Sequence, residues 1–353
     1  LPPRRDAPFS ACLLLPDGGS ETLGEWLAYH YTAASLRHVI VGGDPRSAAS
    51  ARPLLERWNG ATEMDIVWWK DAHYMPTGEA LEEKVRKIST RNLKVGNKTA
   101  GKMSMVRQEE FMSSCLLAHQ KNERKWTMLL DSDEYLVFNT PDMDGKERQH
   151  EEAQHLRTHQ KEVLERINTL RNGLPAAGRE SIAAYADRHR FGLPWIVEPC
   201  MPLPRLLFGS VDGAVRAGAP HVFPAAGAAT ARYRRRARNG GGRLEDRSLV
   251  DLSRIPKKSL KNIAGPHRPF AVCSEHRRGE LPPGGDISRL DQTLLRVHRY
   301  VGAVPGSEDR MQEYEKKDRM AVGNEDDVHP WVTSFVDLVG KEKAQHLLFH
   351  KPV

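Results

Sequence analysis

The chain has 353 residues, of which 39% are hydrophobic and 28% charged, and its formal net charge is +7. It contains no fixed repeat and no apolar run of about 18 residues, which excludes collagen, coiled coils and a membrane-spanning helix within this sequence. Seven Trp and nine Phe provide core material and exclude a wholly disordered chain. The modest positive charge suits anionic ligands but does not by itself predict nucleic-acid binding.

The four cysteines are too few and too widely spaced for a disulfide scaffold or a zinc site. Cys12 and Cys115 lie among apolar residues, which predicts buried free thiols. A bridge between Cys200 and Cys273 stays open at this point. The first five residues lack the apolar centre of a signal peptide, and because the sequence begins with Leu, an upstream segment also stays open.

Over the first 140 residues, apolar runs alternate with helical patterns. Thr22 and Glu25 predict a capping box at the start of the first helix. The predicted strands are 11–15, 39–41, 66–69 and 126–130, and further helices are predicted at 46–58 and 104–122. This alternation predicts an α/β fold with a mixed, mainly parallel sheet and helices on both faces.

In such sheets, ligands bind beyond the carboxyl ends of the strands. Asp17, Asp44 and Asp131 each follow a predicted strand, so we expect them on one rim of the sheet. The strongest signal is at the last position, where Asp131, Asp133 and Glu134 place three carboxylates within four residues. Burying them without a counter-charge would be costly, and a divalent cation would supply that charge.

Oxygen ligands of this kind favour Mg²⁺ or Mn²⁺, which commonly bind one or two carboxylates together with substrate phosphates. The alternative interpretation is an exposed acidic turn, or the start of a helix near Tyr135. The apolar residues on both sides of the triplet leave these two interpretations about equally supported.

Four stretches, residues 11–15, 25–31, 44–47 and 126–139, resemble in order and spacing the opening half of glycosyltransferases of the family 92 type. The last of them is similar to the metal-binding Asp-x-Asp-Glu block of that family. Downstream, Phe208-Gly209-Ser210 resembles a Phe-Gly-Ser element of the same family.

A last stretch resembles the Arg-Val-x-His-Tyr block of that family. Residues 295–300 carry the likeness, although Arg299 separates His298 from Tyr300. The order and spacing of these pieces are fairly specific, whereas each piece alone is not.

The resemblance implies a GT-A type fold and transfer of a sugar, as by a hexosyltransferase, from a nucleotide-sugar to a hydroxyl of a glycan or glycoconjugate. Mn²⁺ or Mg²⁺ would bridge the two phosphates and neutralise charge on the leaving nucleoside diphosphate. Asp133 would bind the metal directly, Asp131 would contact the metal or the ribose, and Glu134 would orient the site. His298 would be the distal metal ligand.

The resemblance also implies nucleotide contacts from Asp44, Ser47 and the pair Arg107 and Gln108. An inverting transfer further needs a carboxylate that deprotonates the acceptor hydroxyl. By position the candidates for this base are Glu275, Asp286 and Asp291, of which we assign Asp291. A retaining reaction would need no such base.

We expect a single domain over residues 9–349. Its parts would be a nucleotide-sugar-binding half at 10–140, a charged helical insertion at 141–180, an acceptor-side half at 181–303 and a C-terminal helical segment at 304–349. Within it, residues 212–247 are rich in Ala, Gly and Arg, which predicts a flexible loop or a patch for anionic ligands. A final helix over about 327–349 is expected to pack on the core.

The resemblance implies residence in the Golgi or another secretory lumen, with membrane attachment only through a segment outside this chain. Asn97-Lys98-Thr99 is a glycosylation acceptor sequence, which has meaning in such a compartment. The expected partners are a nucleotide-sugar donor and a glycan acceptor, and no nucleic acid.

Two other functions compete with this one. A haloacid-dehalogenase-like phosphatase would use Asp131 as its nucleophile, but Tyr135 stands where that motif has Thr or Val. A non-enzymatic protein would be a degenerate transferase domain, or would bind nucleic acid through the basic run 232–238. The intact acidic triplet argues against degeneracy, because carboxylates with no metal to bind only destabilise a fold.

Overall fold

The computed structural model describes part of the chain, and all statements below refer to that part. The described residues are 9–16, 19–43, 45–91, 99–138, 165, 200–203, 205–209, 235–237, 247–261, 263, 295–300, 320–322 and 331–348. The predicted insertion at 141–180, apart from residue 165, and most of the predicted loop at 212–247 lie outside these residues.

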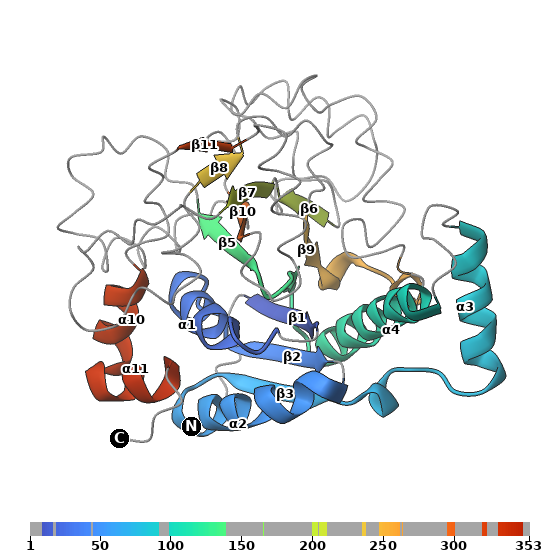
Figure 1. Ribbon diagram of the computed structural model, residues 1–353, viewed down its shortest axis with the longest axis horizontal. Coiled ribbons are helices and arrows are strands. Elements are labelled where there is room, and N and C mark those ends of the chain that lie inside the picture. The colour runs from blue at the N-terminus through green and yellow to red at the C-terminus, as the bar shows by residue number, and fades with distance from the viewer. Residues whose placement is uncertain are drawn as a thin grey trace.

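The strands form two sheets, and in Figure 1 β1, β2 and β3 of the first sheet lie below β5, β7 and β8 of the second. The strands are β1 (Phe9–Leu15), β2 (His38–Gly43), β3 (Asp65–Trp69), β4 (Trp126–Leu129), β5 (Glu134–Phe138), β6 (Cys200–Leu203), β7 (Arg205–Gly209), β8 (Arg235–Ala237), β9 (Arg247–Asp251), β10 (Leu295–Tyr300) and β11 (Met320–Val322). The first sheet has the order β3-β2-β1-β4-β9-β6, and the second β11-β8-β7-β10-β5. Strands β3, β2, β1 and β4 are parallel, whereas β9 pairs antiparallel with β4 and β6.

Helices cover both faces of the first sheet, which confirms the predicted α/β class. They are α1 (Leu23–Ala33), α2 (Pro45–Ala61), α3 (Glu79–Arg91), α4 (Thr99–Lys121), α10 (Trp331–Val339) and α11 (Lys341–Leu348), with short 3-10 turns η1 (Asp71–His73), η3 (Leu252–Arg254) and η4 (Ser259–Lys261). One apolar cluster joins the sheet to α1, α2, α10 and α11, and a second joins it to α4, η3 and η4.

The side chains of the central strand β1 contribute to both apolar clusters. Ala11, Leu13 and Leu15 belong to the first cluster and Cys12 to the second, because successive side chains point to opposite faces. A strand covered on both faces needs a continuous apolar sequence, which is why this segment was recognisable as a buried strand.

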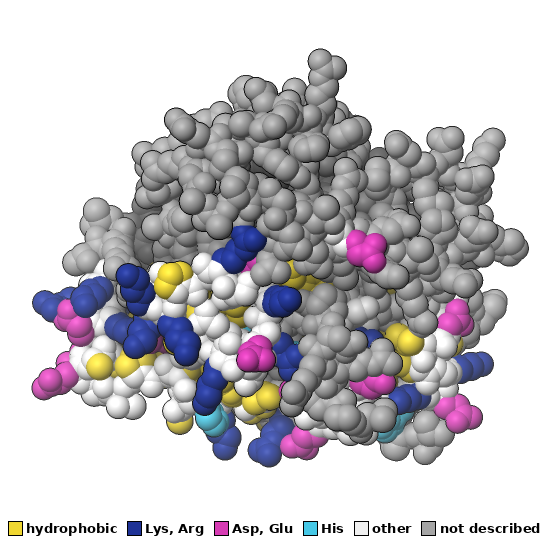
Figure 2. All heavy atoms as spheres, turned by 180° about the vertical axis from the view of Figure 1, so that it is seen from behind, with side chains coloured by type: hydrophobic (Ala, Val, Ile, Leu, Met, Phe, Trp, Pro, Cys, Tyr) yellow, Lys and Arg dark blue, Asp and Glu magenta, His cyan; other side chains and the backbone are white. Residues whose placement is uncertain are grey.

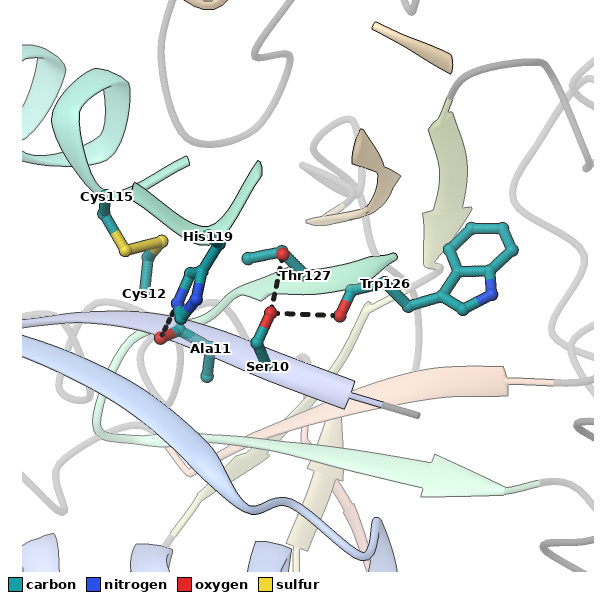
Figure 3. The surroundings of a disulfide bond; sticks show 7 residues. All are labelled: Ser10, Ala11, Cys12, Cys115, His119, Trp126 and Thr127. Carbon is teal, nitrogen blue, oxygen red and sulfur yellow. Dashed lines mark hydrogen bonds between the residues drawn. A yellow bond between two sulfur atoms is a disulfide. The ribbon is translucent and has the colours of Figure 1, made fainter. Parts of the chain in front are cut away.

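Cys12 and Cys115 form a disulfide between β1 and α4, so the prediction of free thiols is wrong (Figure 3). The strand and the helix pack face to face and bring the two Cα atoms to 6.0 Å, a separation that a disulfide bridges. His119, one turn further along α4, donates a hydrogen bond from Nε2 to the carbonyl of Ala11 at 3.1 Å. Cys273, the other half of the bridge left open above, lies outside the described residues.

Three further elements differ from the sequence-based expectation. The helix α3 was not predicted, and the basic run contains a short strand, β8, within the segment expected to be a loop. The expected final helix is two helices, α10 and α11, because Gly340 between them has a φ of +86° that ends the first. Both pack on the core as expected, through Trp331, Phe335, Ala344 and Leu347.

Replacing Cys12 and Cys115 by Ala should lower the free energy of unfolding by about 2–4 kcal/mol, because the bond restricts the unfolded chain. The bond closes a loop with a sequence separation of 103 residues. Guanidinium unfolding under non-reducing conditions measures the loss. Since either single replacement already breaks the bond, the double variant should lose little more than each single one. Clearly additive losses would contradict the cross-link.

Candidate functional site

The three predicted carboxylates lie where the chain passes from the first sheet to the second. They follow β4 at its carboxyl end, and Glu134 is already the first residue of β5. Asp133 is 4% exposed and Glu134 is fully buried, while Asp131 is half-buried. One oxygen from each of the three carboxylates can be chosen so that all lie within 4.8 Å of one another. The acidic triplet is therefore a compact, largely buried cluster and not an exposed turn.

Helix α1 fixes the backbone of this turn through its polar side chains. Thr22 Oγ1 donates to the carbonyl of Ser132 at 3.3 Å, and Trp26 Nε1 donates to the carbonyl of Glu134 at 2.9 Å. Tyr29, one turn later, donates to the carbonyl of Leu136 at 2.7 Å. The predicted capping box is wrong, since the Thr22 side chain makes no cap hydrogen bond at its own helix and instead bonds Ser132.

His30 completes this contact between α1 and β5. Its Nε2 accepts a hydrogen bond from the backbone N–H of Leu136 at 3.2 Å, so the proton is on Nδ1, which donates to the carbonyl of Trp26 at 2.9 Å. Complete burial lowers the pKa of His30 to about 3, and the hydrogen bond to Trp26 only partly opposes this. His30 is therefore a neutral structural residue that holds β5.

Two arginines neutralise most of the negative charge of the cluster. Arg247, the first residue of β9 and 1% exposed, bonds Glu134 through Nε and Asp131 through Nη2. Arg299 on β10 donates from Nε to Asp133 Oδ2 at 3.0 Å. Its Nη atoms lie 3.9 Å from Asp131 and 3.8 Å from Glu134. We refer below to these five side chains as the acid–arginine cluster.

With all five side chains ionised, one negative charge of the cluster is not compensated. Burial raises the pKa of Asp133 to about 6, the Arg299 guanidinium opposes that shift, and Asp131 adds to it. Burial alone would lower the pKa of Arg247, but Asp131 and Glu134 more than offset this and raise it above its ordinary value. Both guanidiniums therefore stay charged, while burial disfavours the ionised form of Asp133.

The cluster can hold a divalent cation by the chemistry of its donors. Asp133 Oδ1 is buried and has no hydrogen-bond partner among the described residues, although Oδ2 of the same group is bonded to Arg299. A buried carboxylate oxygen without a partner is unfavourable, and a hard cation such as Mg²⁺ or Mn²⁺ would satisfy it. The residues present thus fit the predicted metal.

His298, the predicted distal ligand, is not brought to this cluster. In the antiparallel pair of β10 and β5, Arg299 stands opposite Glu134 and His298 opposite Tyr135. Because neighbouring strand residues point to opposite faces, the side chain that meets the carboxylates is Arg299. The His298 ring instead accepts a hydrogen bond at Nε2 from Arg296 Nε at 2.8 Å.

The predicted nucleotide contacts are distributed along the carboxyl edge of the first sheet. Ser47 is buried and donates to the carbonyl of Pro16 at 2.8 Å, which ties the start of α2 to the end of β1. Arg107 on α4 pairs with Asp71, just beyond the end of β3, through two nitrogens at 3.1 and 2.8 Å. Tyr74 donates to the same carboxylate at 2.7 Å.

Three other predicted site residues are Gln108, Asp44 and Asp291. Gln108 follows Arg107 on α4 and is half-buried. Asp44 and the assigned base Asp291 lie outside the described residues.

No protein-family model and no curated protein matches this chain. The described helices include none that is both long enough and apolar enough to cross a bilayer. On the face opposite to that of Figure 1, acidic and basic side chains are mixed over the described surface (Figure 2).

Arg247→Met should destabilise the protein by about 3–5 kcal/mol, because it leaves Glu134 buried without its counter-ion. Adding Glu134→Gln in the same chain should recover part of the loss, since the neutral amide needs no counter-ion. Urea unfolding measures both effects. Arg52→Met is the control, because Arg52 is 60% exposed in its pair with Glu56 and should cost little. Equal losses for Arg247→Met and Arg52→Met would contradict this assignment.

His30 should make stability fall as the pH is lowered from about 6.5 toward 3. In this window the unfolded chain binds a proton at His30 that the folded chain does not, whereas above it both states are neutral. His119, whose pKa burial lowers to about 4, acts in the same direction. Urea unfolding over pH 4–8 should show a smaller acid loss for His30→Asn than for the wild type. An unchanged pH dependence in the variant would refute this role.

Proposed function

We propose that this chain is a GT-A type glycosyltransferase that moves a sugar from a nucleotide-sugar to an acceptor hydroxyl, with Mn²⁺ or Mg²⁺ at the acid–arginine cluster. The observation that carries the proposal is the position of the three carboxylates. They follow a central strand, β4, at the edge where the parallel strands of the first sheet end. That edge is where open α/β sheets bind their ligands.

Within this proposal each carboxylate has its own task. Asp133 would bind the cation directly through Oδ1, which has no partner within the described part of the chain, and Asp131 would be the second ligand. Glu134 orients the site, since its Oε2 accepts hydrogen bonds from Arg247 and from the backbone N–H of Asp131 at 3.0 Å. The cation, when bound, would supply positive charge where the leaving nucleoside diphosphate becomes more negative. His298 is not included in this ligand set.

The nucleoside would extend along the same edge toward β3. The strands β3, β2, β1 and β4 are adjacent and parallel there, so at about 4.8 Å per strand β3 lies about 14 Å across the sheet from β4. Asp71, the partner of Arg107, follows β3. This span suits a nucleoside diphosphate with its phosphates at the cluster. Asp44, Ser47 and Gln108 stay predicted contacts, and Asp291 stays the predicted base.

The disulfide supports a place in the secretory pathway for this proposed enzyme. Disulfides persist in oxidising compartments such as the secretory lumen and are rare in the cytosol. Cys12 and Cys115 are both fully buried, so their bond is part of the core. The Golgi lumen, where glycan acceptors are found, is consistent with this bond.

A second candidate function is a catalytically inactive binding protein on the same fold. The two arginines favour it, because they leave little of the acidic charge uncompensated and thus weaken the sequence-based argument against a cluster without metal. Such a protein would still bind a nucleotide at the carboxyl edge of the sheet, but it would not break the bond between sugar and phosphate.

A screen of nucleotide-sugars for hydrolysis by the purified chain tests the two candidates. We expect Mn²⁺-dependent release of a nucleoside diphosphate from one donor, and a loss of at least about 100-fold in Asp133→Ala, because the charge stabilisation is removed. Asp65→Asn is the control, since Asp65 lies at the opposite end of β3 and its side chain is 48% exposed.

Thermal melting decides between the candidates if no hydrolysis occurs. Stabilisation by a nucleoside diphosphate without turnover of any donor would support the inactive binding protein. A chain that neither turns over a nucleotide-sugar nor melts at a higher temperature with Mn²⁺ and nucleotide would refute both.

A further inference from the structure

We propose that Arg299 is a built-in counter-cation that a divalent metal ion has to displace from Asp133, so that the affinity for metal is set by this arginine. The inference rests on the proposed function, because it assumes a cation at the acid–arginine cluster. It goes beyond that function by naming the residue that regulates when the cation binds.

The two arginines differ in how firmly they are held. Arg247 bonds two carboxylates at once, and its side chain is 1% exposed. The Arg299 side chain is 18% exposed and makes one hydrogen bond to the cluster, to Asp133. Its distances of 3.9 and 3.8 Å to Asp131 and Glu134 are too long for hydrogen bonds. Arg247 is therefore fixed, and Arg299 is the guanidinium that can move.

Asp133 depends on Arg299 for its side-chain hydrogen bond, whereas Asp131 and Glu134 are bonded by Arg247. Within the described part of the chain, its side chain accepts a hydrogen bond from Arg299 alone, through Oδ2, while Oδ1 has no partner. A metal ion at Oδ1 would therefore share one buried carboxylate with a guanidinium. The two positive charges would repel each other strongly, because the surroundings contain little water to screen them.

The total charge of the cluster also indicates that a metal ion would displace Arg299. With both arginines in place the cluster carries one net negative charge, and a divalent cation would turn this into one net positive charge. An uncompensated buried charge is costly, so metal binding has to weaken the Asp133–Arg299 pair and release the guanidinium toward solvent. By linkage, the pair weakens metal binding by the same amount.

An anionic ligand would relieve this excess of positive charge. A diphosphate at the cluster would compensate both the cation and the released guanidinium, so metal and nucleotide should bind more tightly together than separately. Arg299 thereby makes the metal site depend on the nucleotide. It is a positioning residue for the cation and is assigned no contact with the reacting atoms.

Mn²⁺ binding, followed by the electron paramagnetic resonance signal of the free ion, tests the inference on the whole purified chain. We expect Arg299→Gln to bind Mn²⁺ about tenfold more tightly than the wild type, since a charged hydrogen bond no longer has to be broken. Arg299→Lys keeps the charge and should stay near the wild type. Arg254→Gln is the matched control, because Arg254 is 24% exposed and lies 3.6 Å from the buried Asp251, outside the cluster.

A second readout, thermal unfolding without nucleotide, separates this effect from a general structural change. Metal-free Arg299→Gln should melt at a lower temperature than the wild type, and added Mn²⁺ should raise its melting temperature by more. If the wild type binds Mn²⁺ and Arg299→Gln binds it no more tightly, the inference is overturned but the proposed function stays intact. Absence of Mn²⁺ binding in both proteins overturns the inference and the cation of the proposed function together.

Discussion

The pairing of three carboxylates, two of them buried, with two guanidiniums is the interaction on which this structure depends. The first sheet contributes Arg247 on β9 and the end of β4, which leads to Asp131. The second contributes Glu134 on β5 and Arg299 on β10. The cluster is thus the electrostatic junction of the two sheets. Because each partner would be an unpaired buried charge without the others, the sheets cannot separate here without a large cost.

Helix α1 gives this junction a rigid backbone. The carbonyls of Ser132, Glu134 and Leu136 each accept a hydrogen bond from a side chain of α1 or its N-cap. Those carbonyls need partners because the segment is buried. A site held in this way can present its carboxylates in a fixed geometry, which is what binding a small ion of demanding geometry requires.

The sequence predicted the parts of the fold in which one physical signal dominates. The strands β1, β2 and β4 are buried and largely apolar, and β3 is an apolar run at the edge of the sheet. The acidic triplet is visible because three carboxylates follow β4. Helix α3 was missed because its 13 residues are mostly polar, as in a helix that packs only one side against its neighbours. The bond between Cys12 and Cys115 depends on which helix packs on β1, and this is not encoded locally.

The two arginines were missed for different reasons. Arg247 ends a segment rich in Ala, Gly and Arg, where a single functional arginine has no local signal. Arg299 was treated as an interruption between His298 and Tyr300, since histidine is a common metal ligand and His298 was therefore assigned as the ligand. Side chains alternate between the two faces of a strand, and it is Arg299, immediately before Tyr300, that points at the carboxylates.

The disulfide also sets an order of events during synthesis. Cys12 lies in the first described strand, and its partner follows 103 residues later. The bond can therefore close only after Cys115 has left the ribosome, and only where an oxidant reaches the nascent chain. A host that translocates the polypeptide into its periplasm or endoplasmic reticulum meets both conditions, whereas the cytosol of an ordinary bacterial strain meets only the first.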